Sequence, residues 1–167
     1  MKNIILIGMP ASGKTCVGKR VSASLHRPFI DTDELAERMS GKTVAELFAA
    51  EGEDAFRRLE EEILLSLTEE GGAVVATGGG AVLHEKAMRA LKKSGTVFFL
   101  DRPLASIEKD MGGAERPLLC GDAEKLRALF AAREKLYRRY ADYVLSGGTV
   151  EELAETVALM TEMTAED

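Results

Sequence analysis

Short apolar segments alternate with amphipathic segments along the chain. Residues 3–7, Asn-Ile-Ile-Leu-Ile, are mostly branched and apolar in consecutive positions, which is typical of a strand buried on both faces of a parallel sheet. Comparable short runs predict further strands at 28–31, 73–77, 96–100 and 143–145. Apolar residues at helical spacing predict helices over 14–25, 33–70, 84–93, 122–140 and along the C-terminal segment. Because strands alternate with helices, the pattern predicts a three-layer α/β fold: a parallel sheet of about five strands with helices on both faces.

Turn and capping residues indicate where several elements begin and end. Thr43 and Thr149 each precede a glutamate by three positions, the capping-box spacing that starts a helix. Gly52 predicts a break between two helices, and Pro103 suits the first turn of another. Residues 111–122 contain three glycines and a proline, so we predict a mobile loop there. The length of 167 residues fits a single domain.

A glycine-rich segment joins the first predicted strand to the first predicted helix. It matches the pattern G-x-x-x-x-G-K-[ST] at every defined position: Gly8-Met9-Pro10-Ala11-Ser12-Gly13-Lys14-Thr15. The glycines let the backbone curl and direct its N–H groups at phosphate oxygens, and the following helix adds its positive end. Lys14 can reach the β- and γ-phosphates, and the Thr15 hydroxyl can bind Mg²⁺. The segment predicts a P-loop and nucleotide binding, but by itself it does not separate a kinase from an ATPase or a GTPase. The chain has no Asn-Lys-x-Asp sequence, which disfavours the GTPase.

Two aspartates follow the second predicted strand in Asp31-Thr32-Asp33. Ligands bind at the carboxyl ends of strands in open α/β sheets. Residues two apart on an extended chain point the same way, so both carboxylates are expected to face one cleft. One could hold Mg²⁺ through water, and the other could accept a proton from an attacking hydroxyl. The spacing alone fits equally well a helix N-cap aspartate with a solvated neighbour.

Composition limits the classes of partner. The net charge of −6 disfavours nucleic acid, so phosphate would have to bind in a local basic pocket. Neither cysteine belongs to a Cys-x-x-Cys or Cys/His cluster, which argues against zinc and favours a reducing, cytoplasmic setting. No apolar run approaches the ~20 residues of a membrane span, and the N-terminal run is interpreted as a strand and not as a signal peptide. Cys16 is interpreted as a small buried hydrophobe, and His26 and His84 as surface or cap residues.

Further short motifs occur in a fixed order after the P-loop and Asp-Thr-Asp. They are Phe56-Arg57-Arg58-Leu59-Glu60, Gly78-Gly79-Gly80-Ala81-Val82, Arg116-Pro117-Leu118-Leu119 and Arg133-x-x-x-Tyr137. Each is weak alone, since charged residues at such spacing usually form a solvated helix face and aromatic residues usually lie in the core. In combination they resemble the shikimate kinase family over the chain to about residue 160.

The resemblance implies a P-loop NTPase-type fold with a short lid at about 111–122. It also implies transfer of the γ-phosphate of Mg²⁺-ATP to the 3-hydroxyl of shikimate. Catalytic roles are implied for Lys14, Asp33 as the base, and Arg116 from the lid. Asp31, through water, and Thr15 are implied for Mg²⁺. The implied nucleotide-binding set is Gly8, Ala11, Ser12, Gly13, Lys14, Thr15, Cys16 and Arg116.

The resemblance also implies how the acceptor is held, within a helical region at about 32–62 of the single kinase domain, 1–167. Arg57 and Arg133 would grip the shikimate carboxylate, since two guanidinium groups suit a planar anion. Glu60 would orient a substrate-binding arginine. The full implied substrate-binding set is Asp33, Phe48, Phe56, Arg57, Glu60, Gly78, Gly79, Gly80, Pro117, Leu118 and Arg133.

The chain departs from the family pattern around the adenine site. Asp110 falls where many members carry an arginine that stacks on adenine, and residues 146–149 supply no arginine for the other face. Lys109 could take the place of the arginine that is missing at position 110. Alternatives to shikimate kinase are a related kinase for gluconate or another hydroxy acid, or a non-catalytic ligand-binding member. We expect a cytoplasmic monomer that binds shikimate and ATP but neither nucleic acid nor membrane.

Overall fold

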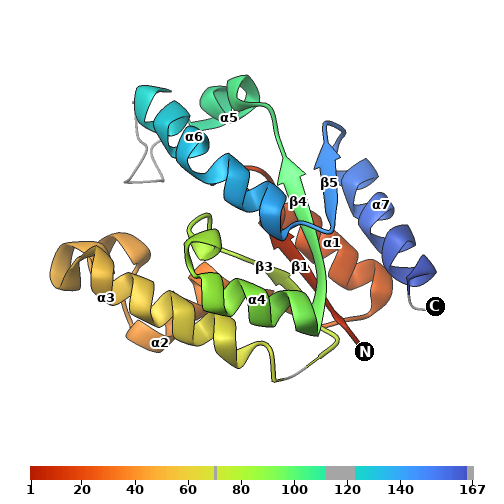
Figure 1. The fold of residues 1–167 in the computed structure, drawn as a ribbon, viewed down its shortest axis with the longest axis horizontal. Helices are drawn as coiled ribbons and strands as arrows, with labels where there is room; N and C mark the ends of the chain where they lie inside the picture. The colour runs from red at the N-terminus through yellow and green to blue at the C-terminus, as the bar shows by residue number, and fades with distance from the viewer. Residues whose placement is uncertain (70, 112–122, 165–167) are drawn as a thin grey trace.

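A five-stranded sheet forms the centre of the computed structural model, which describes residues 1–69, 71–111 and 123–164 (Figure 1). The strand order is β2-β3-β1-β4-β5, and all four pairs are parallel. The register places Ile4 of the central strand opposite Val74 on one side and Thr96 on the other. The strands are β1 (Asn3–Ile7), β2 (Phe29–Asp31), β3 (Val74–Ala76), β4 (Gly95–Asp101) and β5 (Tyr143–Ser146).

Helices cover both faces of the sheet. They are α1 (Lys14–Leu25), α2 (Thr32–Ser40), α3 (Val44–Ser66), α4 (Glu85–Ser94), α5 (Leu104–Met111), α6 (Ala123–Tyr140) and α7 (Val150–Met163), with a 3₁₀ turn, η1 (Ala81–Leu83). The alternation of side chains along β1 divides the core between the two faces. Ile4 and Leu6 pack in one cluster with α1 and α7, whereas Ile5 and Ile7 pack in the other with α4 and α6. The predicted three-layer α/β fold is therefore confirmed.

The predicted helix signals are also present in the structure. Thr43 and Thr149 both form complete capping boxes at the starts of α3 and α7. Gly52, at φ 82° and ψ 171°, interrupts α3, so two helical pieces meet there. The turn η1 was not predicted, and α5 continues to the first residue of the predicted loop 111–122, whose remainder lies outside the described residues.

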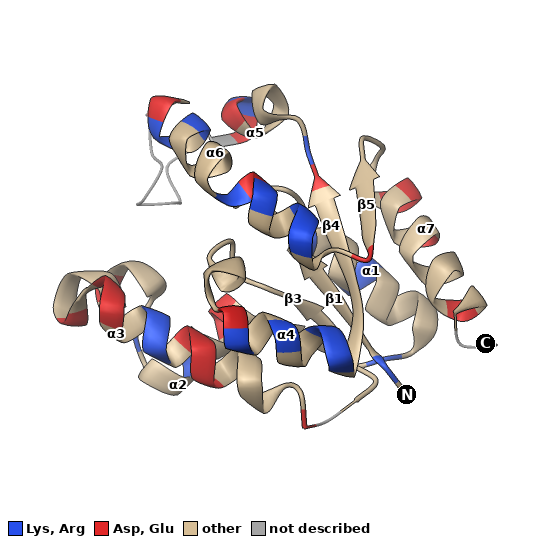
Figure 2. Ribbon diagram, in the orientation of Figure 1, with Lys and Arg blue, Asp and Glu red and all other residues tan. Residues whose placement is uncertain are grey.

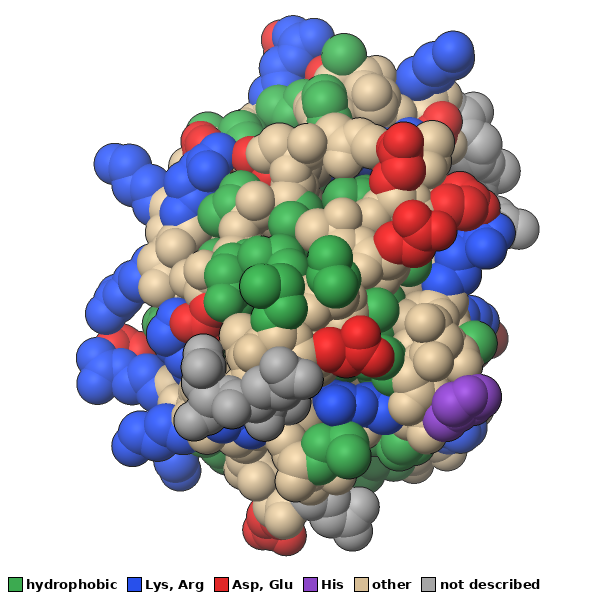
Figure 3. Space-filling model, turned by 90° about the vertical axis from the view of Figure 1, so that its right-hand side faces the viewer, with side chains coloured by type: hydrophobic (Ala, Val, Ile, Leu, Met, Phe, Trp, Pro, Cys, Tyr) green, Lys and Arg blue, Asp and Glu red, His purple; other side chains and the backbone are tan. Residues whose placement is uncertain are grey.

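Charged residues of both signs are interspersed on α2, α3 and α6 (Figure 2). Figure 3 shows the side of the molecule that carries α7, with hydrophobic side chains grouped in its middle and both charges around them. Leu159 and Met163 of α7 are among the exposed hydrophobic residues. Within the described part of the chain, no helix is both long and apolar enough to cross a membrane.

Parallel strands bring five loops to one edge of the sheet. The P-loop follows β1, Asp31 ends β2, the glycines 78–80 follow β3, Arg102 follows β4, and residues 147–149 follow β5. Since the carboxyl ends of all strands meet at this edge, the fold collects there many of the described residues that the sequence analysis singled out.

Candidate active site

A cleft of about 1630 Å³ runs along this edge of the sheet. Pockets for one small ligand usually measure roughly 300–1,000 Å³, so this cleft has room for two ligands side by side. One end is lined by the P-loop, the end of β4 and residues 147–149, and the other by α2, α3 and α6. No group of three or more His, Cys, Asp or Glu side chains suited to a metal ion occurs within 1–69, 71–111 and 123–164.

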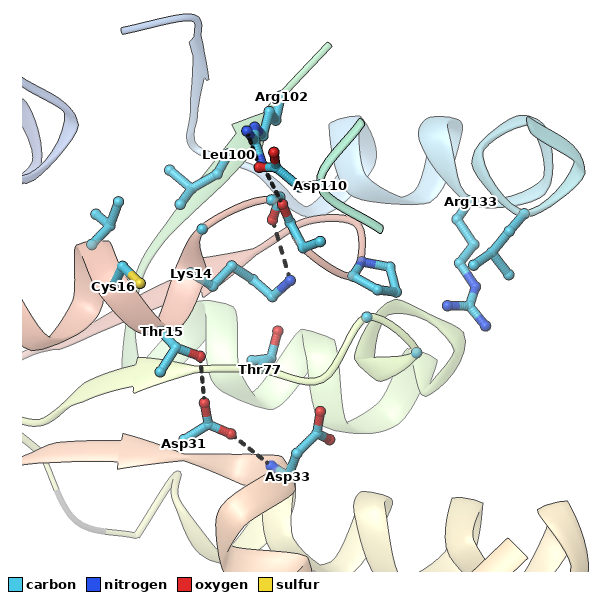
Figure 4. Close-up of a pocket in the computed structure, with 18 of the residues that line it drawn as sticks. Lys14, Thr15, Cys16, Asp31, Asp33, Thr77, Leu100, Arg102, Asp110 and Arg133 are labelled. Atoms are coloured by element: carbon cyan, nitrogen blue, oxygen red, sulfur yellow. Dashed lines mark hydrogen bonds and ion pairs between the residues drawn. The ribbon is translucent and has the colours of Figure 1, made fainter. Parts of the chain in front are cut away.

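Lys14 lies over the P-loop and points into the cleft (Figure 4). Its Nζ donates to the carbonyl oxygens of Gly8 at 2.9 Å and Met9 at 2.7 Å. Gly13, with φ 96°, caps α1 in a left-handed conformation that glycine adopts without strain. The loop thus holds a cation next to the positive end of α1, which is the arrangement that binds phosphate.

Asp31 caps α2 and also contacts the P-loop helix. Its Oδ1 accepts from the backbone N–H of Asp33 at 3.0 Å, while its Oδ2 accepts from the Thr15 hydroxyl at 2.6 Å. The expected geometry of the aspartate pair was therefore wrong in one respect. Asp33 stands in the first turn of α2 and not on an extended strand, and the N-cap interpretation of Asp31 holds together with a place in the cleft.

Arg57 reaches the opposite end of the cleft from α3. Its Nη1 donates to Glu60 Oε2 at 2.7 Å, and its Nη2 lies 3.4 Å from Glu53 Oε1. Phe48 and Phe56 line the same region, with ring centroids 5.0 Å apart. The resemblance implied that Glu60 orients an arginine, and in the structure Glu60 contacts Arg57.

Arg133 of α6 extends into the cleft from the other side (Figure 4). One turn later on the same helix, the Tyr137 hydroxyl donates to the carbonyl oxygen of Gly79 at 2.7 Å. Burial raises the pKa of Tyr137 to about 12, so the hydroxyl keeps its proton and remains a donor. Tyr137 therefore fixes the glycine turn beside Arg133.

The glycines after β3 allow close packing of the acceptor end. A Cβ on Gly78 would lie 2.6 Å from Asp33 Oδ1 and 2.9 Å from Glu60 Oε1, and one on Gly80 would lie 1.9 Å from Arg57 Nη1. The Gly78 N–H donates to the Thr32 hydroxyl at 2.9 Å, which ties the turn to the start of α2. Larger residues here would displace the side chains that face the cleft.

Arg102 occupies the nucleotide end of the cleft together with Asp110. Its Nη1 donates to the Ala11 carbonyl at 2.9 Å, and its Nη2 donates to Asp110 Oδ2 at 2.5 Å (Figure 4). Lys109, the suggested substitute for the missing arginine, is exposed and is not among the described residues that line the cleft. The guanidinium beside the P-loop thus comes from the end of β4.

The cleft brings together most of the site residues expected from the sequence. Its lining includes Ala11, Ser12, Gly13, Lys14, Thr15, Cys16, Asp31, Asp33, Phe48, Phe56, Arg57, Glu60, Gly79, Gly80 and Arg133. Gly8 and Gly78 lie behind it and contact residues that line it. Arg116, Pro117 and Leu118 lie outside the described residues.

The interpretation of Cys16 was wrong: it is exposed and lines the cleft, so it is not a buried hydrophobe. His84 is a cap residue, as one of the two alternatives expected, because it is the N-cap position of α4 and caps through its backbone. It is not a surface residue: its side chain is 10% exposed, and its Nε2 lies 2.8 Å from Glu60 Oε2. The contacts made by His84, Tyr137 and Arg102 were not identified from the sequence. Only Tyr137 carried a signal, its place in the Arg133-x-x-x-Tyr137 motif.

Fold and site together define a P-loop protein whose cleft extends from the P-loop to an end that contains Arg57 and Arg133. Residues 10–163 match the family model for shikimate kinase. The chain belongs to the shikimate kinase family, as the order of its motifs predicted.

Known shikimate kinases resemble the chain both in sequence and in structure. The chain is 44% identical to the shikimate kinase of Caldanaerobacter subterraneus subsp. tengcongensis over 162 residues, 94% of each protein. It superimposes on the shikimate kinase from Acinetobacter baumannii, solved in complex with shikimate, with a TM-score of 0.91 and 34% identity, covering 98% of this chain and 94% of the other. A gluconokinase from Sinorhizobium meliloti has a TM-score of 0.60 and 15% identity over 99% of this chain and 94% of the other, which shows a shared fold alone.

Proposed function

We propose that this chain is an ATP-dependent kinase that phosphorylates the 3-hydroxyl of shikimate. The observation that carries the proposal is that a single cleft contains the P-loop lysine Lys14 and, at its other end, Arg57, Arg133 and Asp33. A polyphosphate and a small carboxylic acid can therefore lie next to each other. Membership of the family and the likeness to the Acinetobacter baumannii enzyme, solved with shikimate, support the same acceptor.

At the nucleotide end, Lys14 and the N-terminus of α1 would hold the ATP phosphates. Mg²⁺ prefers oxygen ligands and is usually bound through one or two protein oxygens together with phosphates and water. The Thr15 hydroxyl and the Asp31 carboxylate lie in contact beside the P-loop, so these two residues fit the ion. When bound there, Mg²⁺ would neutralise charge that builds up on the phosphates.

At the acceptor end, Arg57 and Arg133 would bind the shikimate carboxylate from two sides, with Phe48 and Phe56 against the ring. Guanidinium groups form strong, charge-assisted hydrogen bonds with a planar anion. Phe48 and Phe56 beside the two arginines support shikimate over gluconate, because gluconate is an open chain and has no ring to pack on the two aromatic residues. In this proposal the helical region 32–62 is the acceptor-binding part of the kinase domain.

Asp33 would act on the attacking hydroxyl. The 3-hydroxyl oxygen bonds to the γ-phosphorus, the bond from that phosphorus to the bridging oxygen breaks, and the hydroxyl proton passes to the Asp33 carboxylate. Lys14 stabilises charge on the transferred group. Arg116, Pro117 and Leu118 keep their expected roles as part of the proposal, and the cytoplasmic, monomeric state remains a prediction.

An assay of ADP release with three acceptor conditions tests this function. We expect rapid release with ATP and shikimate, and little with gluconate or with no acceptor. Faster ADP release with gluconate than with shikimate would show that the acceptor is another hydroxy acid and not shikimate. Release that does not depend on any acceptor would identify an ATPase, and binding of both ligands without release would identify a non-catalytic member.

Arg57→Ala is expected to weaken shikimate binding about ten- to a hundredfold, because a charge-assisted contact contributes about 1.5–3 kcal/mol. ATP affinity measured without shikimate should hardly change. Arg58→Ala is the matched control, since Arg58 is the next residue of α3 and is exposed. Titration calorimetry with each ligand gives both affinities. Equal losses for the two ligands would contradict the assignment of Arg57 to the acceptor.

Arg102→Ala is expected to raise the KM for ATP about fivefold, a typical effect of a partly exposed charge. The substitution removes a cation near the phosphates and frees the Ala11 carbonyl. The KM for shikimate should stay the same. Arg127→Ala is the control, because Arg127 also pairs with α5, through Glu108, but does not line the cleft. An unchanged KM for ATP would show that Arg102 only joins β4 to α5.

A further inference from the structure

Glu60 receives two hydrogen bonds on one carboxylate oxygen beneath the acceptor end of the cleft. Arg57 Nη1 lies 2.7 Å and His84 Nε2 lies 2.8 Å from its Oε2. The Glu60 side chain is 3% exposed and that of His84 is 10% exposed, so water does not compete freely with either contact. The three residues form an almost dry cluster in which Arg57 is the member nearest the acceptor.

The direction of the His84 hydrogen bond follows from the charge of Glu60. Burial pushes the pKa of Glu60 upward, but the hydrogen bond from His84 and the charge of Arg57 outweigh it and leave the pKa below the ordinary value. An ionised carboxylate can only accept hydrogen bonds. His84 Nε2 must therefore carry a proton and donate it, as a neutral ring protonated on this nitrogen can do.

The cluster leaves Arg57 dependent on Glu60 for its orientation. The second acidic contact of Arg57 is with Glu53 at 3.4 Å, a residue whose side chain is 64% exposed. Arg57 Nε and Glu60 Oε1 are buried and make no hydrogen bond within the described part of the chain. Among the described residues, His84 is the one hydrogen-bond partner besides Arg57 that holds the Glu60 carboxylate in this orientation.

The backbone of His84 is fixed by two hydrogen bonds, and the residue lies behind the cleft. It stands between η1 and α4, where its N–H donates to the Ala81 carbonyl and its own carbonyl accepts from Met88 N–H. It is not among the described residues that line the cleft. His84 can therefore act on the acceptor only through Glu60.

We propose that His84 is a positioning residue for acceptor binding: its Nε2–H fixes the Glu60 carboxylate, which fixes the Arg57 guanidinium at the acceptor end of the cleft. The inference rests on the proposed function, in which Arg57 binds the shikimate carboxylate. It adds a residue four positions beyond Gly80, in a segment to which the motifs assigned no role.

Two substitutions separate the hydrogen bond from the space that the ring fills. His84→Leu keeps bulk and removes the donor, whereas the amide nitrogen of His84→Gln can reach the place of Nε2. We expect His84→Leu to raise the KM for shikimate about tenfold, as loss of a charge-assisted contact would. The KM for ATP and kcat should remain within about twofold, and His84→Gln should restore most of the shikimate KM.

A double-mutant cycle and a control sharpen the test. If His84 acts through Arg57, then His84→Leu should raise the shikimate KM little further in the Arg57→Ala background. His26→Asn is the control, since His26 is the other histidine, is exposed, and has the positive φ of 52° that asparagine tolerates. An unchanged shikimate KM in His84→Leu would overturn the proposal. So would equal increases in both KM values, or a full additional loss in the Arg57→Ala background.

A measurement without substrate separates this inference from the proposed function. In ¹⁵N NMR spectra of the ligand-free wild-type protein, we expect His84 Nε2 to carry a proton. His84→Leu identifies the signals. A ring with its proton on Nδ1 and none on Nε2 would overturn the His84–Glu60 hydrogen bond whatever the acceptor is. Failure of wild-type protein to phosphorylate shikimate would overturn the proposed function, while the ring signals would still decide the contact.

Discussion

Lys14→Ala is expected to lower turnover at least about 10²–10³-fold, the usual effect of removing one preorganised charge from a transition state. In the structure the Lys14 ammonium lies over the P-loop and contacts the Gly8 and Met9 carbonyls. It is therefore already held where the β- and γ-phosphates are proposed to bind. The core clusters of the sheet do not include Lys14, so the fold should persist. Steady-state kinetics with ATP and shikimate measure the loss, and circular dichroism verifies the fold.

Two further variants make the Lys14 result specific. Lys14→Met keeps most of the apolar stem and loses the charge, so it should be as inactive as Lys14→Ala while disturbing the loop less. Lys19→Ala, on an exposed position of the same helix, should leave turnover unchanged. Turnover near that of the wild type in Lys14→Met would refute the assignment of this loop to the transferred phosphates.

Features that depend on adjacent residues were predictable from the sequence. A P-loop is built from eight consecutive residues between a strand and a helix, so one contiguous segment is enough to predict it. The capping boxes at Thr43 and Thr149 need only a glutamate three positions later, and the break at Gly52 needs only a backbone freedom peculiar to glycine. These elements formed where the local pattern indicated.

Contacts between distant segments could not be predicted in this way. His84 meets Glu60 across 24 positions, and Tyr137 meets Gly79 across 58. Arg102 and Asp110 are only eight positions apart, but their pairing depends on how α5 leaves β4. Such pairs arise from the packing of elements, on which the residue pattern of either segment carries no information.

Side-chain direction was the other source of error. On α1 the buried residues Val17 and Val21 face the sheet, whereas Cys16 precedes Val17 by about 100° of rotation and faces the cleft. Asp33 was placed on an extended chain, but helix α2 begins one residue earlier, at Thr32. Asp31 is the N-cap of that helix, so the residue that was interpreted as a metal ligand also ends the extended segment and starts the helix.

Asp33→Asn is expected to lower kcat about 10²–10⁴-fold, the range that a positioned general base contributes. Asparagine preserves the shape of the side chain but cannot take the proton of the 3-hydroxyl. The turn that holds Asp33 should survive, because it depends on the Thr32 hydroxyl and the Gly78 N–H. The KM for ATP should change by less than about twofold, since ATP is proposed to bind at the other end of the cleft.

Glu34→Gln is the matched control for Asp33→Asn, as Glu34 is the next carboxylate on α2 and is exposed. It should leave both kcat and KM unchanged. A single-turnover experiment with saturating ATP and shikimate separates chemistry from product release, and the loss in Asp33→Asn should appear in the chemical step. Transfer within a few-fold of the wild-type rate would exclude Asp33 as the base and leave it a role in orienting the hydroxyl. Loss of ATP binding together with transfer would instead indicate that α2 no longer starts correctly beside the P-loop.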